Sequence, residues 1–300
     1  MKKIILTSLL GLILIALAAC GSEDEGANGD GGDSESNGGK LEELQEAGTV
    51  TIGFANEEPY AYEEDGELKG AAVDIAAAVF AELGIDNMKS QLSNFDSLIP
   101  GLQANQFDVV TAGMAITPDR CEQAAFGEPE MVYGEGLVVQ AGNPLNIQSY
   151  QDIADNPDIR VTVMSGATEV GYLESVGVSD DQVTPADDIP ATFSAIQADR
   201  ADVTTATEMT LRMAVETAGD DLEFVDNFEQ PDIEGVPSYG AAAFSKDNTK
   251  LRDAYNEKLK ELKEDGTVAE LLEANGFDPE SNMAEAGEIT TESVCNGENY

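Results

Sequence analysis

The 300-residue sequence contains no histidine and no tryptophan, and its positive charges are few. Without histidine there is no Ser-His-Asp triad, no histidine general base and no histidine metal ligand. Lysine and arginine number 15 against 59 aspartates and glutamates, so the net charge at pH 7 is −44. A chain of this charge is a poor partner for nucleic acid or an anionic lipid surface. Because the acidic residues are spread along the whole chain, we interpret them as a solvated surface suited to high salt, as in a halophile.

Cysteine is also scarce, with Cys20, Cys121 and Cys295 as the three examples. Two cysteines without histidine are too few for a structural zinc site, so we predict no metal and no cofactor. If Cys20 is modified, Cys121 and Cys295 remain, and in an oxidising compartment we expect them to form one disulfide. Two free buried thiols are the alternative.

Long apolar runs are missing except near the start, where residues 4–19 follow Lys2 and Lys3. This run is shorter than the ~20 residues of a membrane-spanning helix, and the segment 17–21 (LAACG) is typical of a lipoprotein signal peptide. We therefore expect a signal peptide at residues 1–19, lipidation of Cys20, and a location on the outer face of the cell membrane. A plain secretory signal is the alternative. Residues 20–40, rich in Gly, Ser, Asn, Asp and Glu, are expected to form a disordered linker.

Beyond residue 40 the apolar pattern alternates between strands and helices, which predicts α/β layers with mostly parallel sheets. The expected strands include residues 49–54, 88–92, 107–111, 137–140, 160–164, 201–205 and 222–225. The expected helices include residues 71–83, 95–104, 190–198, 208–218 and 248–265. We expect residues 41–140 and 238–300 to form one lobe and residues 141–237 to form a second, inserted lobe. The hinges are expected near residues 140–143 and 237–239, with the ligand between the lobes.

Residues 113–120 (GMAITPDR) resemble the signature of the extracellular amino-acid-type solute-binding proteins of ABC transporters. Other segments that resemble this family follow in the same order: 52–60 (IGFANEEPY), 98–102 (LIPGL), 107–110 (FDVV), 165–169 (SGATE) and 198–203 (ADRADV). Within the family, the sequence is most similar to ectoine- and hydroxyectoine-binding proteins. The segments that carry this likeness are 56–60 (NEEPY), 120–121 (RC), 141–144 (AGNP) and 166–172 (GATEVGY).

The resemblance implies a two-lobe fold of the type II periplasmic-binding-protein kind and a monomer that binds a small zwitterionic solute and delivers it to ABC transporter permease subunits. A polar amino acid or another carboxylate-bearing solute is the alternative ligand. A cleft enzyme of the dehydratase kind is a distant alternative, but no partner base or oxyanion arrangement is recognisable. The expected ligand-binding residues are Glu57, Tyr60, Phe95, Gly113, Ala115, Thr117, Arg120, Gly166, Thr168 and Thr207.

Arg120 is the central residue of the expected site, since a planar guanidinium binds a carboxylate through two parallel hydrogen bonds. Thr117 is expected to cap the helix that carries it. From the residues alone, a surface salt bridge is an equal alternative, and the resemblance favours the carboxylate clamp. Gly166 and Thr168 open a helix in the second lobe, where free backbone amides favour the same carboxylate.

The resemblance implies that Glu57, Tyr60 and Phe95 surround the cationic part of the solute. Phe95 could instead be an ordinary core residue, and Glu57 one more solvated acid. Two positions depart from the family. Thr207 stands where binders of α-amino acids carry an aspartate for the ammonium group, which argues against a standard amino acid. Ala115 stands where ectoine binders usually carry an aromatic residue, which would leave one wall of the aromatic box missing.

Overall fold

The computed structural model describes residues 39–298. The expected signal peptide, Cys20 and nearly all of the expected linker lie outside the described residues. Within residues 39–298, every helix is too short or too polar to cross a membrane.

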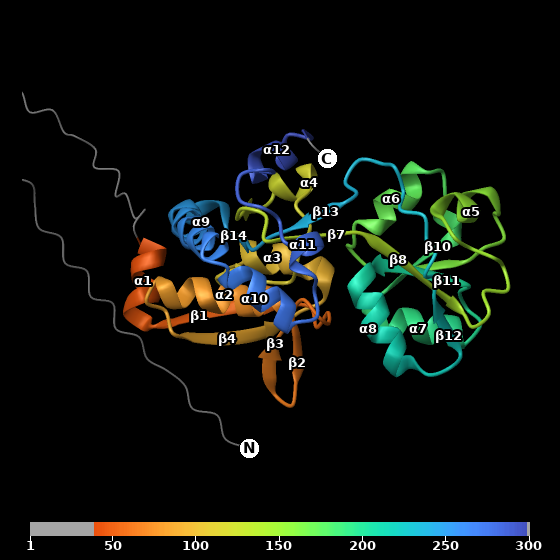
Figure 1. Ribbon diagram of the computed structural model, residues 1–300, viewed down its shortest axis with the longest axis horizontal. Helices are drawn as coiled ribbons and strands as arrows, with labels where there is room; N and C mark the ends of the chain where they lie inside the picture. The colour runs from red at the N-terminus through yellow and green to blue at the C-terminus, as the bar shows by residue number, and fades with distance from the viewer. Residues whose placement is uncertain (1–38, 299–300) are drawn as a thin grey trace, which may run out of the picture. The chain divides into compact units, whose positions relative to one another are not determined.

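The first lobe is built on a mixed sheet of five strands. In spatial order they are β4 (Asn87–Leu92), β1 (Thr49–Phe54), β5 (Val109–Val110), β14 (Ala243–Phe244) and β6 (Ala125–Phe126). β1 is parallel to β4 and β5, whereas β14 is antiparallel to both of its neighbours. Since β14 comes from late in the chain, orange and blue segments share this lobe in Figure 1.

Helices with an apolar stripe pack in this lobe. α2 (Ala71–Glu82) packs against α9 (Thr249–Glu264) and α10 (Thr267–Ala274). The side chains that α9 buries are three or four positions apart, as one face of a helix requires: Leu251, Tyr255, Leu259 and Leu262. The other helices of the lobe are α1 (Gly39–Ala47), α3 (Leu98–Gln103), α4 (Pro118–Cys121), α11 (Pro279–Asn282) and α12 (Thr291–Cys295). β2 (Tyr62–Glu64) and β3 (Glu67–Lys69) form a separate hairpin.

The second lobe has a five-stranded sheet of its own. In spatial order its strands are β10 (Val183–Ala186), β9 (Val161–Met164), β11 (Val203–Thr207), β8 (Glu135–Gln140) and β12 (Leu222–Phe224). β9 is parallel to β10 and β11, and β8 is antiparallel to β11 and β12. Its helices are α5 (Tyr150–Asp155), α6 (Glu169–Ser175), α7 (Ile189–Gln197) and α8 (Glu208–Ala218).

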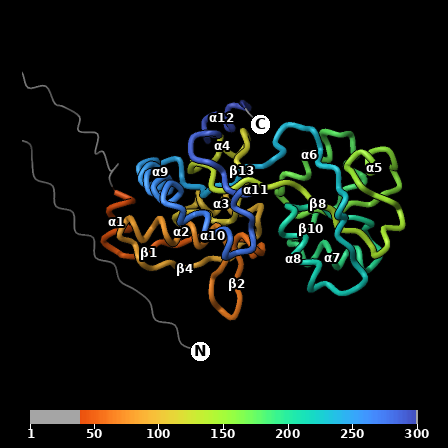
Figure 2. The backbone as a smooth tube through the Cα atoms, in the orientation of Figure 1, coloured from red at the N-terminus to blue at the C-terminus, as the bar shows by residue number. Residues whose placement is uncertain are grey.

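Two neighbouring segments join the lobes. The chain leaves the first lobe through β7 (Met131–Tyr133) and returns through β13 (Ser238–Gly240), and these two strands pair antiparallel. Figure 2 shows the backbone passing from one lobe to the other along these segments. The two-lobe α/β fold that the sequence predicts is thus confirmed.

The predicted place of the first hinge is wrong. The sequence assigned residues 137–140 to the first lobe, but β8 pairs with β11 in the sheet of the second, with Val139 opposite Val203. The crossing therefore lies at Gly134, between β7 and β8, and not at residues 140–143. Those residues form a turn within the second lobe, where the backbone N–H of Gly142 donates to the Glu223 carboxylate at 2.6 Å. An apolar strand has the same local pattern in either sheet, so its pattern could not reveal its partner.

Candidate functional site

Arg120 extends from the first lobe to the second. The hydroxyl of Thr117 accepts a hydrogen bond from the backbone N–H of Arg120 at 3.2 Å and so caps α4. The guanidinium donates to the backbone carbonyls of Ala115 and Gly166, each at 2.8 Å. Its central carbon lies 5.4 Å from the centre of the Phe95 ring. Because Gly166 belongs to the second lobe, Arg120 links the two lobes directly.

A cavity lies beside Arg120 and takes its lining from both lobes. Of the predicted site residues, those that line it are Glu57, Tyr60, Phe95, Gly113, Ala115, Arg120, Thr168 and Thr207. Thr117 and Gly166 are outside the lining and contact Arg120 instead. The space inside is about 30 Å³, enough for about two water molecules. A solute of amino-acid size therefore enters only when the lobes move apart.

Two predicted glycines permit close packing around this cavity. A Cβ atom on Gly113 would lie 2.4 Å from a ring carbon of Tyr60, and one on Gly166 would lie 2.9 Å from the Cα of Asp96. Both residues also have φ values in the left-handed region, at +60° and +81°. Since Asp96 belongs to the first lobe, any side chain at Gly166 would hold the lobes apart.

Glu57 is a buried acid of the first lobe that bonds to the second. One of its carboxylate oxygens accepts hydrogen bonds from the hydroxyls of Thr210 at 3.0 Å and Thr207 at 3.4 Å. Burial, together with the negative charge of nearby Glu169, raises the pKa of Glu57 to about 7. The two hydroxyls and Arg120 oppose this shift. Glu57 is therefore not the solvated surface acid that the sequence left open.

The aromatic side chains form an apolar wall. Tyr60 is buried, and its ring packs edge-on against Tyr133 at 5.3 Å and Phe277 at 5.2 Å between ring centres. Within the described part of the chain the Tyr60 hydroxyl makes no hydrogen bond of normal geometry, although Thr207 lies near it. Phe95 is buried in the apolar core of the first lobe, and its ring also lines the cavity next to Arg120, so its contact with the solute stays a prediction. Ala115 leaves its part of the wall without a ring.

Thr207 ends β11, at the place where the resemblance implies an aspartate for an ammonium group. Its hydroxyl bonds to Thr210 at 3.0 Å and reaches Glu57. The next residue, Glu208, cannot replace the missing aspartate, because its carboxylate pairs with Arg212 at 2.8 Å. The acids that line the cavity are instead Glu57 from the first lobe and Glu169 from the second.

Two acids of the second lobe, Glu135 and Glu169, were not predicted as site residues. Glu169 is the first residue of α6 and lines the cavity, and Glu135 begins β8 behind it. Both are almost completely buried: Glu135 is 1% exposed and Glu169 is 3% exposed. Burial raises the pKa of Glu135 well above its usual range, and Glu169 adds to that shift. Burial also raises the pKa of Glu169, while the hydrogen bond from Glu135 and the charge of Arg120 oppose the rise. The two carboxyl groups lie close enough for a hydrogen bond, so they titrate together, and burial raises the pKa of both.

The sequence carried a signal for one member of this pair. Glu169 follows Thr168 inside the segment 166–172 that resembles the family. Glu135 had no such marker, because it is one of 59 acidic residues and stands in an apolar strand whose sheet was assigned wrongly.

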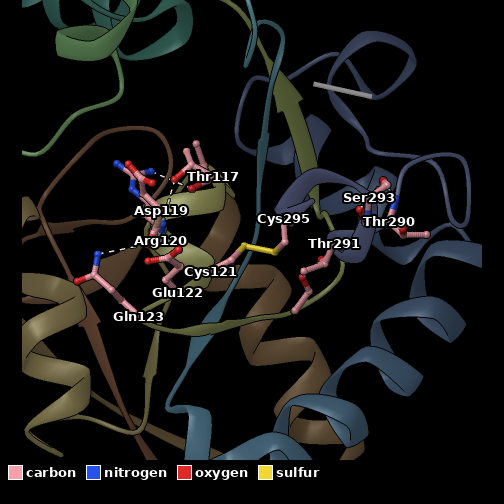
Figure 3. Close-up of a disulfide and its surroundings, with 12 residues drawn as sticks. Thr117, Asp119, Arg120, Cys121, Glu122, Gln123, Thr290, Thr291, Ser293 and Cys295 are labelled. Carbon is pink, nitrogen blue, oxygen red and sulfur yellow. Dashed lines mark hydrogen bonds between the residues drawn. A yellow bond between two sulfur atoms is a disulfide. The ribbon is translucent and has the colours of Figure 1, made fainter. Parts of the chain in front are cut away.

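A disulfide fastens the C-terminal segment behind Arg120. Cys121 in α4 is bonded to Cys295 in α12, with 5.8 Å between their Cα atoms (Figure 3). This is the cysteine pair that the sequence left available. Within residues 39–298, no cluster of three or more acidic or cysteine side chains could hold a metal ion.

The arrangement is suited to binding a zwitterion. A guanidinium that reaches both lobes can hold a carboxylate, and buried acids with an aromatic wall can hold a delocalised cation. Because Arg120, Glu57 and Thr210 all contact the opposite lobe, the same residues can couple ligand binding to cleft closure.

Comparisons with known proteins agree with this geometry. The family model of the bacterial extracellular solute-binding proteins, family 3, matches residues 50–276. A probable amino-acid ABC transporter periplasmic-binding protein of Sinorhizobium fredii is 38% identical over 85% of each chain. The arginine-binding extracellular protein ArtP of Bacillus subtilis is 29% identical over 90% of this chain and 96% of its own.

Among solved structures, a similar one is that of EhuB in complex with hydroxyectoine. It superposes with a TM-score of 0.78 at 35% identity, over 85% of this chain and 97% of EhuB. The ancestral arginine-binding protein bound to arginine has a TM-score of 0.66 at 27% identity, over 76% of this chain and 98% of its own.

Proposed function

This chain belongs to family 3 of the bacterial extracellular solute-binding proteins, and on that premise we propose that it captures a small zwitterionic compatible solute, ectoine or hydroxyectoine, for an ABC importer. The observation that carries the proposal is the cavity in which Arg120 faces Glu57, with Thr207 in place of an aspartate. A ligand with a localised ammonium group would find no carboxylate at that place, whereas a delocalised cation can use Glu57 and the rings. The similarity to EhuB supports the same choice.

We also propose that Cys20 carries a lipid that holds the monomer at the outer face of the cell membrane, next to the permease subunits. Support for the anchor comes from the segment 17–21 and the polar residues that follow it. Two acyl chains on one cysteine would be enough for stable anchoring.

Titration calorimetry of the mature protein tests the ligand. The panel is ectoine, hydroxyectoine, proline, glycine betaine and polar amino acids including arginine. We expect the tightest binding with ectoine or hydroxyectoine. Tighter binding of a polar amino acid would replace this ligand with the second candidate and would leave the transport function in place.

The affinity for ectoine should rise with pH through neutrality. The pKa of Glu57 is about 7, and the cation prefers the ionised carboxylate, so protonation competes with binding below that pH. Between pH 6 and pH 8 the affinity should therefore increase about tenfold, since the ionised fraction changes by that factor around the pKa. Calorimetry across this range measures the effect. The Glu57→Gln variant should bind weakly and lose this slope, and an unchanged slope in that variant would contradict the role of Glu57.

The substitution Ala115→Phe should restore the missing aromatic wall. The ring would stand beside the cation and add about 0.5–2 kcal/mol of binding free energy for ectoine. The carbonyl of residue 115 that accepts from Arg120 belongs to the backbone, so the change need not disturb that bond. Calorimetry on the wild type, Ala115→Phe and the control Ala115→Leu measures the effect. Leucine adds bulk without an aromatic face, so loss of binding in both variants would show that Ala115 instead makes room for a larger solute.

A further inference from the structure

The second lobe places more negative charge at the cavity than the proposed function uses. Glu169 lines the cavity from the first turn of α6, and Glu135 supports it from behind. Glu57 approaches the same cavity from the first lobe. Among the lining residues that belong to the described range 39–298, Arg120 alone carries a positive charge. The site thus has two lining carboxyl groups, one from each lobe, for one guanidinium.

Burying carboxylates in this way is costly unless a partner compensates for it. An ionised acid in a dry cavity is destabilising unless it is paired with a cation or hydrogen-bonded. The two carboxyl groups of the second lobe lie within hydrogen-bonding reach of each other, and the positive charge of Arg120 favours the ionised forms of Glu57 and Glu169. When a solute carboxylate engages Arg120, the guanidinium is neutralised, and Glu57 and Glu169 then need a second cation. The cationic part of the same solute can supply it.

A separate observation indicates that a polar ligand belongs in this cavity. Among residues 39–298 the hydroxyl of Tyr60 has no partner at hydrogen-bond geometry, although Thr207 lies near it and the residue is only 1% exposed and lines the cavity. A buried hydroxyl without a partner is unfavourable, and most native examples are satisfied by a ligand or by water. The polar groups of the wall are therefore incomplete without an occupant.

We propose that Glu57 and Glu169 hold the cation of the solute from opposite lobes, so that the site selects an amidinium or guanidinium with N–H donors on two sides over a quaternary ammonium. This inference rests on the proposed function and deepens it by giving the chemical class of the cation. Ectoine, a cyclic amidinium with two N–H groups and a carboxylate, fits the class. Arginine has a suitable guanidinium, but its α-ammonium group would find no carboxylate at Thr207. Glycine betaine has the carboxylate and a positive charge but no N–H group, so it can bond to neither acid.

Glu135 lies behind Glu169 in this scheme, close enough for a hydrogen bond between the two carboxyl groups. The Ser238 hydroxyl also reaches Glu135, at 3.5 Å, from the returning strand β13.

The test compares ectoine and glycine betaine on the wild type and on two matched variants of α6. Glu169→Gln keeps the shape of the side chain and removes its charge, while Glu174→Gln makes the same change at an exposed position of the same helix. The wild type should prefer ectoine at least tenfold. Glu169→Gln should lose about tenfold or more in ectoine affinity and much of the preference for ectoine over glycine betaine. Glu174→Gln should match the wild type in both. Thermal unfolding checks that both variants are folded.

The results of these titrations distinguish a failure of the role of Glu169 from a failure of the proposed function. If the wild type binds ectoine and Glu169→Gln binds it equally well, the role of Glu169 is wrong and the proposed function stands. Equal binding of ectoine and glycine betaine by the wild type would also overturn the inference, without any variant. Should the wild type bind no zwitterion at all, both fail.

Discussion

Replacing Arg120 with alanine is expected to abolish measurable solute binding while the protein stays folded. Within residues 39–298 the guanidinium is the one positive charge that lines the cavity, and it interacts with the charges of Glu57 and Glu169. Without it, the carboxylate of the solute would be buried unpaired beside two acids. Truncating one partner of a buried charge pair costs about 2–5 kcal/mol, and calorimetry with the preferred solute measures this loss.

Two further variants make the Arg120 result specific. Arg120→Lys keeps the charge but not the planar pair of donors, so it should recover part of the affinity. Arg200→Ala removes an exposed arginine that is outside the cavity lining and should bind like the wild type. Affinity close to that of the wild type in Arg120→Ala would overturn the carboxylate clamp, and the alternative of a surface salt bridge would return.

Arg120 also shows how much of the site could be predicted from the sequence. Its position depends on local features: Thr117 caps α4, and Pro118 occupies the first turn. Capping residues and proline act over three or four positions, so the sequence pattern reveals them. The contact with Gly166, by contrast, joins residues 46 positions apart. The resemblance to a known family led us to expect that both residues hold the same carboxylate, but not that they bond to each other.

The first hinge and the acidic pair show what local patterns cannot reveal. β8 is an apolar strand next to a crossing, and which sheet it joins depends on its pairing with β11, more than 60 residues away in the chain. Placing β8 in the wrong lobe also hid Glu135, whose importance comes from lying behind Glu169. In a chain with 59 acids, composition alone does not mark a buried one. Burial is a property of the tertiary structure, and it is what turns Glu57, Glu135 and Glu169 into site residues.

Removing the disulfide should destabilise the protein strongly while leaving the ligand site largely intact. The bond between Cys121 and Cys295 closes a loop over a sequence separation of 174 residues. In the chain-entropy model, a loop of that length contributes about 5 kcal/mol by restricting the unfolded chain. The double variant Cys121→Ser/Cys295→Ser should therefore lose several kcal/mol of unfolding free energy in urea. Solute affinity should change little, because Arg120 is also held by the Thr117 cap and by its bonds to the carbonyls of Ala115 and Gly166.

Other contacts hold the C-terminal segment on the folded protein when the disulfide is absent. The Thr291 backbone N–H donates to the Glu128 carboxylate at 3.1 Å, and its hydroxyl donates to the carbonyl of Gly127. Val294 is fully buried against the core of the first lobe. These contacts should keep α12 docked in the folded double variant. The loss of unfolding free energy should therefore come from the greater freedom of the unfolded chain and not from a detached segment. Reduction of the wild type supplies the matched control: a reductant should bring its unfolding midpoint to that of the double variant and should leave the double variant unchanged. A loss below about 1 kcal/mol would mean that the unfolded chain gains little freedom when this bond is absent.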